Sequence, residues 1–125
     1  MFLGIDICST ARLRKALERS PFLRDEVFSP AEVEYCAGAR VPEQHLAARW
    51  AAKEACLKAV GLSVLGYDLS RLEVVHRSTG QPELAVRSPE LRADLERVTG
   101  SRSFTTLLSI SHETDYSVAC VMVMP

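Results

Sequence analysis

The sequence Ala47-Ala48-Arg49-Trp50-Ala51-Ala52-Lys53-Glu54-Ala55-Cys56-Leu57-Lys58-Ala59-Val60-Gly61 decides the fold of this 125-residue chain. Alanine is the strongest helix former and no proline interrupts the stretch, so it predicts a long helix that Gly61 ends as a cap. At about 100° per residue, one helix face is all alanine and the next is bulky and apolar, with Arg49 and Lys53 on the far side. Glu54 and Lys58 stand one turn apart on an edge of the alanine face. A helix this apolar is normally buried, so a carboxylate and an ammonium within it require a reason.

Composition and charge exclude several classes of protein. The chain is 47% hydrophobic and 25% charged, as expected of a single globular domain over residues 1–125. A formal net charge of −1 argues against general nucleic-acid binding. No run reaches about 18 apolar residues, so we expect no membrane span. The four scattered cysteines form no C-x-x-C pair, which favours reduced thiols in the cytoplasm over a zinc site or a disulfide framework.

The first strand is predicted from Phe2 to Ile7, with Gly4 and Asp6 on one face. Gly4 has no side chain, so we expect open space beside Asp6. An ionised aspartate in an apolar strand is costly unless it is paired or binds a metal. Taken alone, Asp6 is either a strand-end carboxylate that accepts a backbone N–H or a metal ligand.

A helix capped by Ser9 or Thr10 follows, and it concentrates positive charge in a chain that is nearly neutral. The basic side chains on it are Arg12, Arg14, Lys15 and Arg19. They form either a solvated helix face or a surface for an acidic partner.

The remaining segments complete an α+β fold, with a mostly antiparallel sheet packed on the long alanine-rich helix. The helix starts are Ser29-Pro30 and Ser88-Pro89, and the later strands are expected over residues 72–76, 84–86, 105–112 and 116–124. The last two strands form a hairpin, and His112 lies where the first of them ends. Taken alone, His112 is an ordinary strand-end histidine, and His45 and His76 have no supporting context.

Four short motifs stand in order along the chain. They are Gly4-Ile5-Asp6-Ile7, Arg49-Trp50-Ala51-Ala52-Lys53-Glu54-Ala55 with Lys58 and Gly61, Gly80-Gln81-Pro82, and Ser109-Ile110-Ser111-His112. Together they resemble the holo-acyl-carrier-protein synthases, the small trimeric class of 4′-phosphopantetheinyl transferases. The resemblance covers nearly the whole chain and implies the 4′-phosphopantetheinyl transferase fold.

The resemblance assigns a metal site to the start of the chain and the long helix. Asp6 and Glu54 match the two carboxylates that bind Mg²⁺ in the family, and Lys58 matches the lysine that contacts the pyrophosphate of coenzyme A. Two oxygen ligands suit Mg²⁺, which fills its other positions with water and phosphate oxygens.

The resemblance also implies where the rest of coenzyme A binds. Arg49 and His112 match positions around the 3′-phosphate of its nucleotide end, and the turn from Gly80 to Pro82 matches a loop that borders the same end. Members are homotrimers with the site between subunits, so His112 is expected to serve a site whose carboxylates lie on another chain. The basic helix, from Arg12 onward, matches the helix that receives the acidic recognition helix of the acyl carrier protein.

The implied reaction moves the 4′-phosphopantetheine group from coenzyme A to a serine of apo acyl carrier protein. Its products are the holo carrier and adenosine 3′,5′-bisphosphate, within fatty acid or polyketide biosynthesis. Displacement at a pyrophosphate mainly needs positioning and charge neutralisation. Glu54 would take the serine proton, directly or through a metal-bound water, and Lys58 would neutralise or protonate the leaving bisphosphate.

Two departures from the family pattern leave alternatives open. Cys8-Ser9-Thr10 stands where an acidic residue usually follows, and Gly61-Leu62-Ser63 replaces a Gly-Thr-Gly turn. The alternatives are a divergent, inactive trimer that still binds carrier proteins, and another divalent-metal phosphotransferase that shares the two carboxylates.

Overall fold

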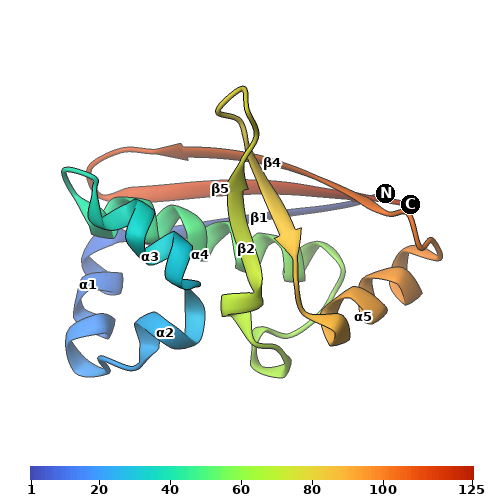
Figure 1. Ribbon diagram of the computed structural model, residues 1–125, viewed down its shortest axis with the longest axis horizontal. Coiled ribbons are helices and arrows are strands. Elements are labelled where there is room, and N and C mark those ends of the chain that lie inside the picture. The colour runs from blue at the N-terminus through green and yellow to red at the C-terminus, as the bar shows by residue number, and fades with distance from the viewer.

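A three-stranded antiparallel sheet and one long helix form the centre of the computed structural model, which describes residues 1–125 (Figure 1). The elements, in chain order, are β1 (Phe2–Ser9), α1 (Thr10–Arg19), α2 (Leu23–Val27), α3 (Pro30–Ala37), α4 (Pro42–Ala59), η1 (Val64–Gly66), η2 (Leu69–Arg71), β2 (Leu72–His76), β3 (Pro82–Val86), α5 (Pro89–Thr99), β4 (Thr105–His112) and β5 (Tyr116–Met124). The predicted α+β class is confirmed.

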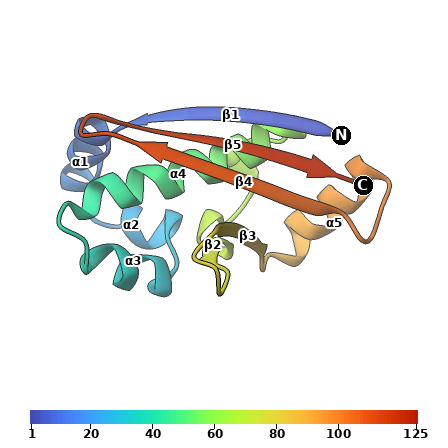
Figure 2. The ribbon, with the colours of Figure 1, turned by 90° about the horizontal axis from the view of Figure 1, so that it is seen from above.

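The sheet has the strand order β1-β5-β4, and β2 and β3 form a separate antiparallel hairpin. Phe2 pairs with Val123, so the two termini lie side by side at one end of the sheet, as Figure 2 shows. The predicted hairpin of β4 and β5 is present with the predicted bounds.

Helix α4 lies along one face of the sheet and touches β1 at Gly4. A Cβ at Gly4 would lie 2.0 Å from the Ala55 carbonyl oxygen and 2.8 Å from the Ala59 backbone nitrogen. The expectation of open space at this glycine is therefore wrong, because the helix backbone fills it. Ala51 and Ala55 are fully buried, so the alanine face works as expected and lets the helix lie close to the strands.

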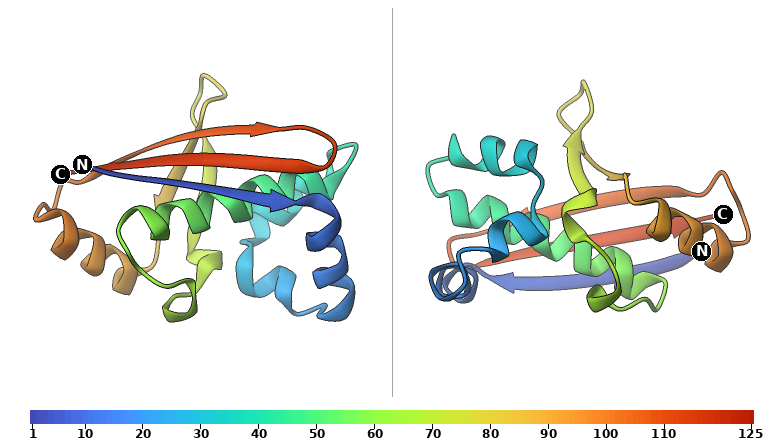
Figure 3. Two further views of the ribbon diagram at one scale, coloured as in Figure 1. Left: turned by 180° about the vertical axis from the view of Figure 1, so that it is seen from behind. Right: turned by 60° about the horizontal axis from the view of Figure 1, so that its bottom comes forward.

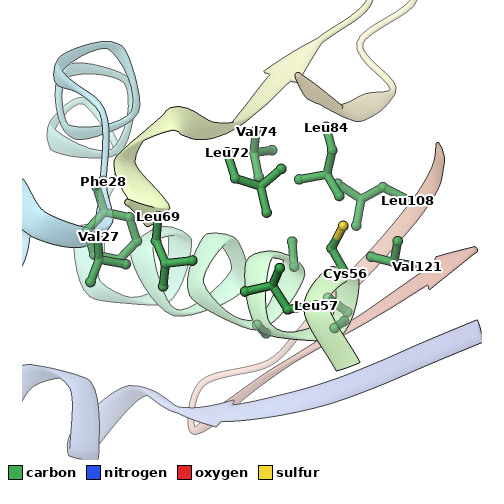
Figure 4. Packing of buried hydrophobic residues seen from close by; sticks show 14 of the residues in the cluster. Val27, Phe28, Cys56, Leu57, Leu69, Leu72, Val74, Leu84, Leu108 and Val121 are labelled. Carbon is green, nitrogen blue, oxygen red and sulfur yellow. The ribbon is translucent and has the colours of Figure 1, made fainter. Parts of the chain in front are cut away.

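The hairpin of β2 and β3 packs on α4 from the side away from β1. Figure 4 shows Leu72, Val74 and Leu84 pointing from the hairpin toward Cys56 and Leu57 of α4. The helix is thus enclosed by apolar contacts on two sides.

Two helices differ from the prediction, one in where it begins and one in being present at all. Helix α4 begins at Pro42 rather than at Ala47, because a proline in the first turn fits a helix start and places no N–H where one is needed. Helix α2, over Leu23–Val27, was expected to be loop, because five residues are too short to show a helical period.

The buried ammonium of α4 belongs to Lys53, which the sequence placed on the far side. Its Nζ lies 2.6 Å from Glu32 Oε1 and donates to the carbonyl oxygens of Val27, at 2.5 Å, and Leu69, at 2.9 Å. Glu32 also closes the capping box of α3 and accepts the Val74 N–H at 3.0 Å. Both charged side chains are fully buried, so this network ties α2, α3, η2 and β2 to α4.

The outer face of the sheet carries no covering layer. All helices lie on the opposite side, as Figure 1 and the view from behind in Figure 3 show. Leu3, Ile5, Ile7 and Leu107 are 65%, 59%, 61% and 49% exposed there, respectively. We call these four residues the outer apolar face.

None of the helices combines the length and the apolar composition that crossing a membrane requires.

Candidate active site

Asp6 and Glu54 meet where β1 runs along α4. Trp50, one turn before Glu54, donates its indole N–H to Glu54 Oε1 and so fixes one oxygen of that carboxylate. Lys58, one turn after Glu54, places its Nζ 3.6 Å from Asp6 Oδ1. The structure therefore brings together the three residues that the sequence selected for metal and pyrophosphate.

The two carboxylates of this group carry more negative charge than the one neighbouring ammonium of Lys58 offsets. Burial raises the pKa of Glu54, and a hydrogen bond and charge repulsion from Asp6 raise it further, whereas the Trp50 N–H and Lys58 oppose the rise. Burial and the same two carboxylates raise the pKa of the neighbouring Cys8 thiol to about 11. Lys58 is 60% exposed, so it offsets this negative field only in part.

A cavity of about 210 Å³ opens onto the two carboxylates. Its lining includes Asp6, Cys8, Trp50 and Glu54, and Arg12 of α1 also lines it. The chain has no cluster of three or more His, Cys, Asp or Glu side chains able to hold a metal. A cation here would therefore have two protein oxygens and would take its other ligands from water and substrate, as Mg²⁺ commonly does.

Arg49 and His112 lie together in a second group, on another side of α4. Arg49 is 4% exposed, and its guanidinium stacks on the Tyr35 ring at 4.6 Å from the ring centre. His112 lies 5.3 Å from His45, measured between ring centres, and His76 stacks on Tyr35 at 4.8 Å. None of these residues lines the cavity at Asp6 and Glu54.

The turn of Gly80 and Pro82 lies at the tip of the β2–β3 hairpin, which projects beyond the sheet in Figure 1. Gly80 has φ +86°, a left-handed conformation that favours glycine in this turn. Pro82 borders a second cavity, of about 290 Å³, together with Leu107 and Met122 on the outer face of the sheet. No residue lines both this cavity and the one at Asp6.

The four basic residues selected for docking are exposed along α1. Arg12 reaches the cavity at Asp6, whereas Arg14, Lys15 and Arg19 do not line it. The closest carboxylate to Arg14 is that of Glu43, at 3.9 Å. The basic face thus starts at the cavity and continues away from it.

Sequence reasoning missed one side chain of the site. Trp50 was assigned to the apolar face alone, although its spacing of four residues before Glu54 is the signal that places an indole N–H on that carboxylate. Of the two caps predicted for α1, Ser9 is the one that the structure shows, and its side chain accepts the Arg12 N–H at 3.2 Å. This serine is the N-cap of the basic helix.

Comparison with known proteins places these features in a family. The model of the 4′-phosphopantetheinyl transferase superfamily matches residues 2–121. The holo-[acyl-carrier-protein] synthase of Geobacter sulfurreducens is 39% identical over 122 residues, which cover 96% of this chain and 94% of that protein. Among solved structures, a Chronobacterium ammoniagenes ACPS-CoA complex matches with a TM-score of 0.85 at 29% identity, over 98% of this chain and 96% of the other. The holo-[acyl-carrier-protein] synthase of Neisseria meningitidis matches with a TM-score of 0.84 at 29% identity, over 99% and 98%.

Proposed function

Because the chain belongs to the 4′-phosphopantetheinyl transferase superfamily, and within it to the holo-acyl-carrier-protein synthases, we propose that it transfers 4′-phosphopantetheine from coenzyme A to a serine of apo acyl carrier protein. The observation that carries the proposal is the meeting of Asp6 and Glu54 at one cavity, with the Lys58 ammonium 3.6 Å from Asp6 Oδ1. The products are the holo carrier and adenosine 3′,5′-bisphosphate. Fatty acid or polyketide biosynthesis, in the cytoplasm, is the setting that we propose, and the four free cysteines suit it.

The two carboxylates fit Mg²⁺. Burial and the repulsion between them raise the pKa of Glu54, and a bound divalent cation would relieve that repulsion; hard oxygen ligands are those that Mg²⁺ prefers. When bound, the ion would neutralise charge that develops on the phosphoryl oxygens. Asp6 and Glu54 would hold it.

The side chains of the site then account for the transfer. The serine oxygen of the carrier attacks the phosphorus that bears the pantetheine arm, and the bond to the leaving bisphosphate breaks. Glu54 takes the serine proton, directly or through a water. Lys58 is positioned by Asp6, at 3.6 Å, to neutralise or protonate the leaving group.

The nucleotide end of coenzyme A is assigned to the second group. Arg49 and His112 would contact the region of its 3′-phosphate, and the turn of Gly80 and Pro82 would border it. Within one chain, none of these residues lines the cavity at Asp6 and Glu54.

A homotrimer resolves this separation, because the nucleotide side of one subunit would complete the metal side of its neighbour. The outer apolar face supports this assembly. Side chains such as Ile5, at 59% exposed, are costly to leave in water as a contiguous patch, and such patches mark interfaces.

The carrier protein is assigned to α1. Arg12 lies at the cavity, and Arg14, Lys15 and Arg19 continue the positive face from there. An acidic helix of the carrier protein, bound along α1, would place the carrier serine near the cavity that Arg12 lines. Charge complementarity of this kind mainly raises the rate of encounter and fixes orientation.

The test is incubation of the protein with coenzyme A, Mg²⁺ and several apo carrier proteins, followed by intact mass measurement of the carriers. Addition of phosphopantetheine to at least one carrier is the expected result. If no carrier gains mass although the protein still binds carriers, the transfer proposal fails and an inactive carrier-binding trimer replaces it. Consumption of a different phosphorylated substrate would instead indicate another metal-dependent phosphotransferase.

A further inference from the structure

Trp50 of α4 is held between the apolar core and the cavity at Asp6 and Glu54. It is the only tryptophan of the chain. Its ring packs edge-on against that of Phe28, which is 1% exposed, with 6.1 Å between ring centres and 71° between ring planes. The same side chain lines the cavity. Packing on Phe28 therefore fixes the indole, while its single polar atom reaches the site at Glu54.

The geometry of α4 accounts for the contact between Trp50 and Glu54. Side chains on a helix lean toward its N-terminus, so the Glu54 carboxylate lies over the turn that carries Trp50, four residues earlier. The indole N–H donates to Glu54 Oε1, and no other N–H group of the chain donates to this carboxylate. Lys58, one turn later, has its Nζ 3.6 Å from Asp6 Oδ1 instead. Among the N–H donors of the chain, Trp50 alone therefore orients the Glu54 carboxylate.

An oriented carboxylate is a better ligand than a mobile one. A glutamate side chain has several rotamers, and restricting them at the moment of binding costs conformational entropy. A hydrogen bond to an ionised oxygen is among the strong ones, and removal of a group that holds a ligating side chain commonly reduces metal affinity or activity by about 10–100-fold. Because the indole N–H occupies Oε1, Glu54 has Oε2 available for a second partner.

We infer that Trp50 is a positioning residue of the active site: its indole N–H holds Oε1 of Glu54, so that the carboxylate is oriented before substrate arrives and offers Oε2 to a cation or to the serine hydroxyl. The inference rests on the proposed function, because the cation and the hydroxyl are those of the proposed transfer. Trp50 acts through Glu54 and requires no contact with substrate. The alternative is a hydrogen bond between helix neighbours that only adds stability.

The first test is Trp50→Phe, which keeps an aromatic ring beside Phe28 but removes the N–H. The affinity for Mg²⁺ is measured without substrate, from the rise in melting temperature with Mg²⁺ concentration. We expect this affinity to fall by about tenfold, and kcat at saturating Mg²⁺ to fall as well. The matched background is Glu54→Asp, whose carboxylate is one methylene shorter and does not reach the indole. In that background Trp50→Phe should change the Mg²⁺ affinity by less than about twofold.

The second test uses the single indole N–H as a spectroscopic signal. In a proton–nitrogen NMR correlation spectrum the wild type has one indole resonance, which should lie downfield and exchange slowly with water because its proton is donated to a carboxylate. In Glu54→Gln the acceptor is neutral, so the resonance should move upfield. Addition of Mg²⁺ to the wild type should leave the N–H protected from exchange, since the cation takes the other oxygen of Glu54.

Equal losses of Mg²⁺ affinity in the two backgrounds, or no loss in either, would overturn the inference. So would an indole resonance that Glu54→Gln leaves unmoved, or one that loses its protection in Mg²⁺. These outcomes leave the proposed function intact if the wild type still transfers phosphopantetheine. A wild type that binds Mg²⁺ but transfers to no carrier would overturn the proposed function, and the Mg²⁺ and indole measurements would still decide the role of Trp50. If Trp50→Phe does not fold, which circular dichroism would show, the indole resonances of the wild type and of Glu54→Gln decide the inference.

Discussion

Glu54 is held in an environment that disfavours its charge, and this has a consequence for stability. Its pKa is raised by burial and by Asp6, so the folded state binds this proton more tightly than the unfolded state does. The stabilising contribution is complete below the unfolded pKa of about 4.3 and is lost as the pH rises through the folded value. At neutral pH the ionised Glu54 therefore destabilises the metal-free protein.

Glu54→Gln should accordingly raise the melting temperature of the metal-free protein at pH 7, by about 1–3 °C, while nearly abolishing transfer. The difference in melting temperature should vanish below about pH 4, where Glu54 is protonated in both states. Scanning calorimetry at several pH values checks this result. Mg²⁺ should raise the melting temperature of the wild type but not of the variant. A variant that is less stable at pH 7, or that transfers at the wild-type rate, would contradict this assignment.

The two lysines Lys53 and Lys58 of α4 are predicted to have different roles, one in stability and the other in catalysis. Lys53 is fully buried against Glu32, whereas Lys58 is 60% exposed beside Asp6. Lys53→Met leaves the Glu32 carboxylate buried without its cation, so we expect a loss of about 3–5 kcal/mol in the free energy of unfolding. Lys58→Met should change stability by less than about 0.5 kcal/mol and instead reduce kcat. Urea denaturation and steady-state kinetics of both variants separate the two roles. Equal stability losses would refute the distinction.

At the scale of elements, the register of β1 against α4 positions the site. Asp6 and Gly4 share the face of β1 that lies on α4, and the missing Cβ of Gly4 allows the strand to touch the Ala55 carbonyl. Gly4→Ala would place a methyl group 2.0 Å from that backbone oxygen, so strand and helix must separate. We expect a stability loss of about 3 kcal/mol or more and weaker Mg²⁺ binding, since Asp6 moves with the strand.

The matched control is Gly66→Ala, because a Cβ at Gly66 meets no atom within 4 Å. Thermal denaturation of both variants, with and without Mg²⁺, measures the effect. A Gly4→Ala protein of unchanged stability would show that the close approach of β1 and α4 is not required.

The proposal that the carrier protein binds along α1 leads to a separate prediction. Lys15→Glu combined with Arg19→Glu reverses two exposed charges outside the cavity, so the KM for the carrier protein should rise, by about tenfold at low ionic strength, with little change in the KM for coenzyme A. The dependence of the carrier KM on salt should flatten. Arg102→Glu is the control, because this exposed arginine lies in the loop between α5 and β4, at the opposite end of the molecule from α1 (Figure 1). An unchanged KM for the carrier protein would indicate that these basic side chains form only a solvated helix face.

The sequence was most informative where local periodicity decides the structure. The long helix, the C-terminal hairpin and the face that carries Asp6 follow from such patterns, and the family motifs selected Glu54 and Lys58. The Lys53–Glu32 pair was missed because its partners are 21 residues apart in sequence, and no helical or strand period connects them. The grouping of His45 and His76 around Tyr35 was not predicted for a related reason, since only the packing of separate elements brings these rings together.

At the scale of the whole molecule, the two groups of proposed site residues lie apart within one chain. Asp6 and Glu54 line one cavity, and Pro82 borders another on the outer side of the sheet. If the proposed trimer forms, each active site would combine the carboxylates of one subunit with Arg49 and His112 of the next. The assembly would then be a condition for activity and not only for stability.

Ile5→Glu tests the assembly itself. A carboxylate in the outer apolar face should reduce the particle mass in light scattering from three chains to one chain of 13.8 kDa, with loss of transfer, because a buried unpaired charge is costly at an interface. Leu65→Glu is the control, since Leu65 is 94% exposed in η1 and lies outside that face. A wild type that is monomeric while active would refute the trimer.

Subunit mixing tests whether the site is shared. Glu54→Gln disables the carboxylate side and Arg49→Ala the nucleotide side, so each variant alone should be inactive. Trimers formed from an equal mixture, refolded together, should regain activity at roughly a quarter of the sites, because a head-to-tail interface pairs an intact half from each variant that often by chance. Transfer is measured by the intact mass of the carrier protein. If both halves of a site came from the same chain, the mixture would stay as inactive as its components, even though the trimers had formed.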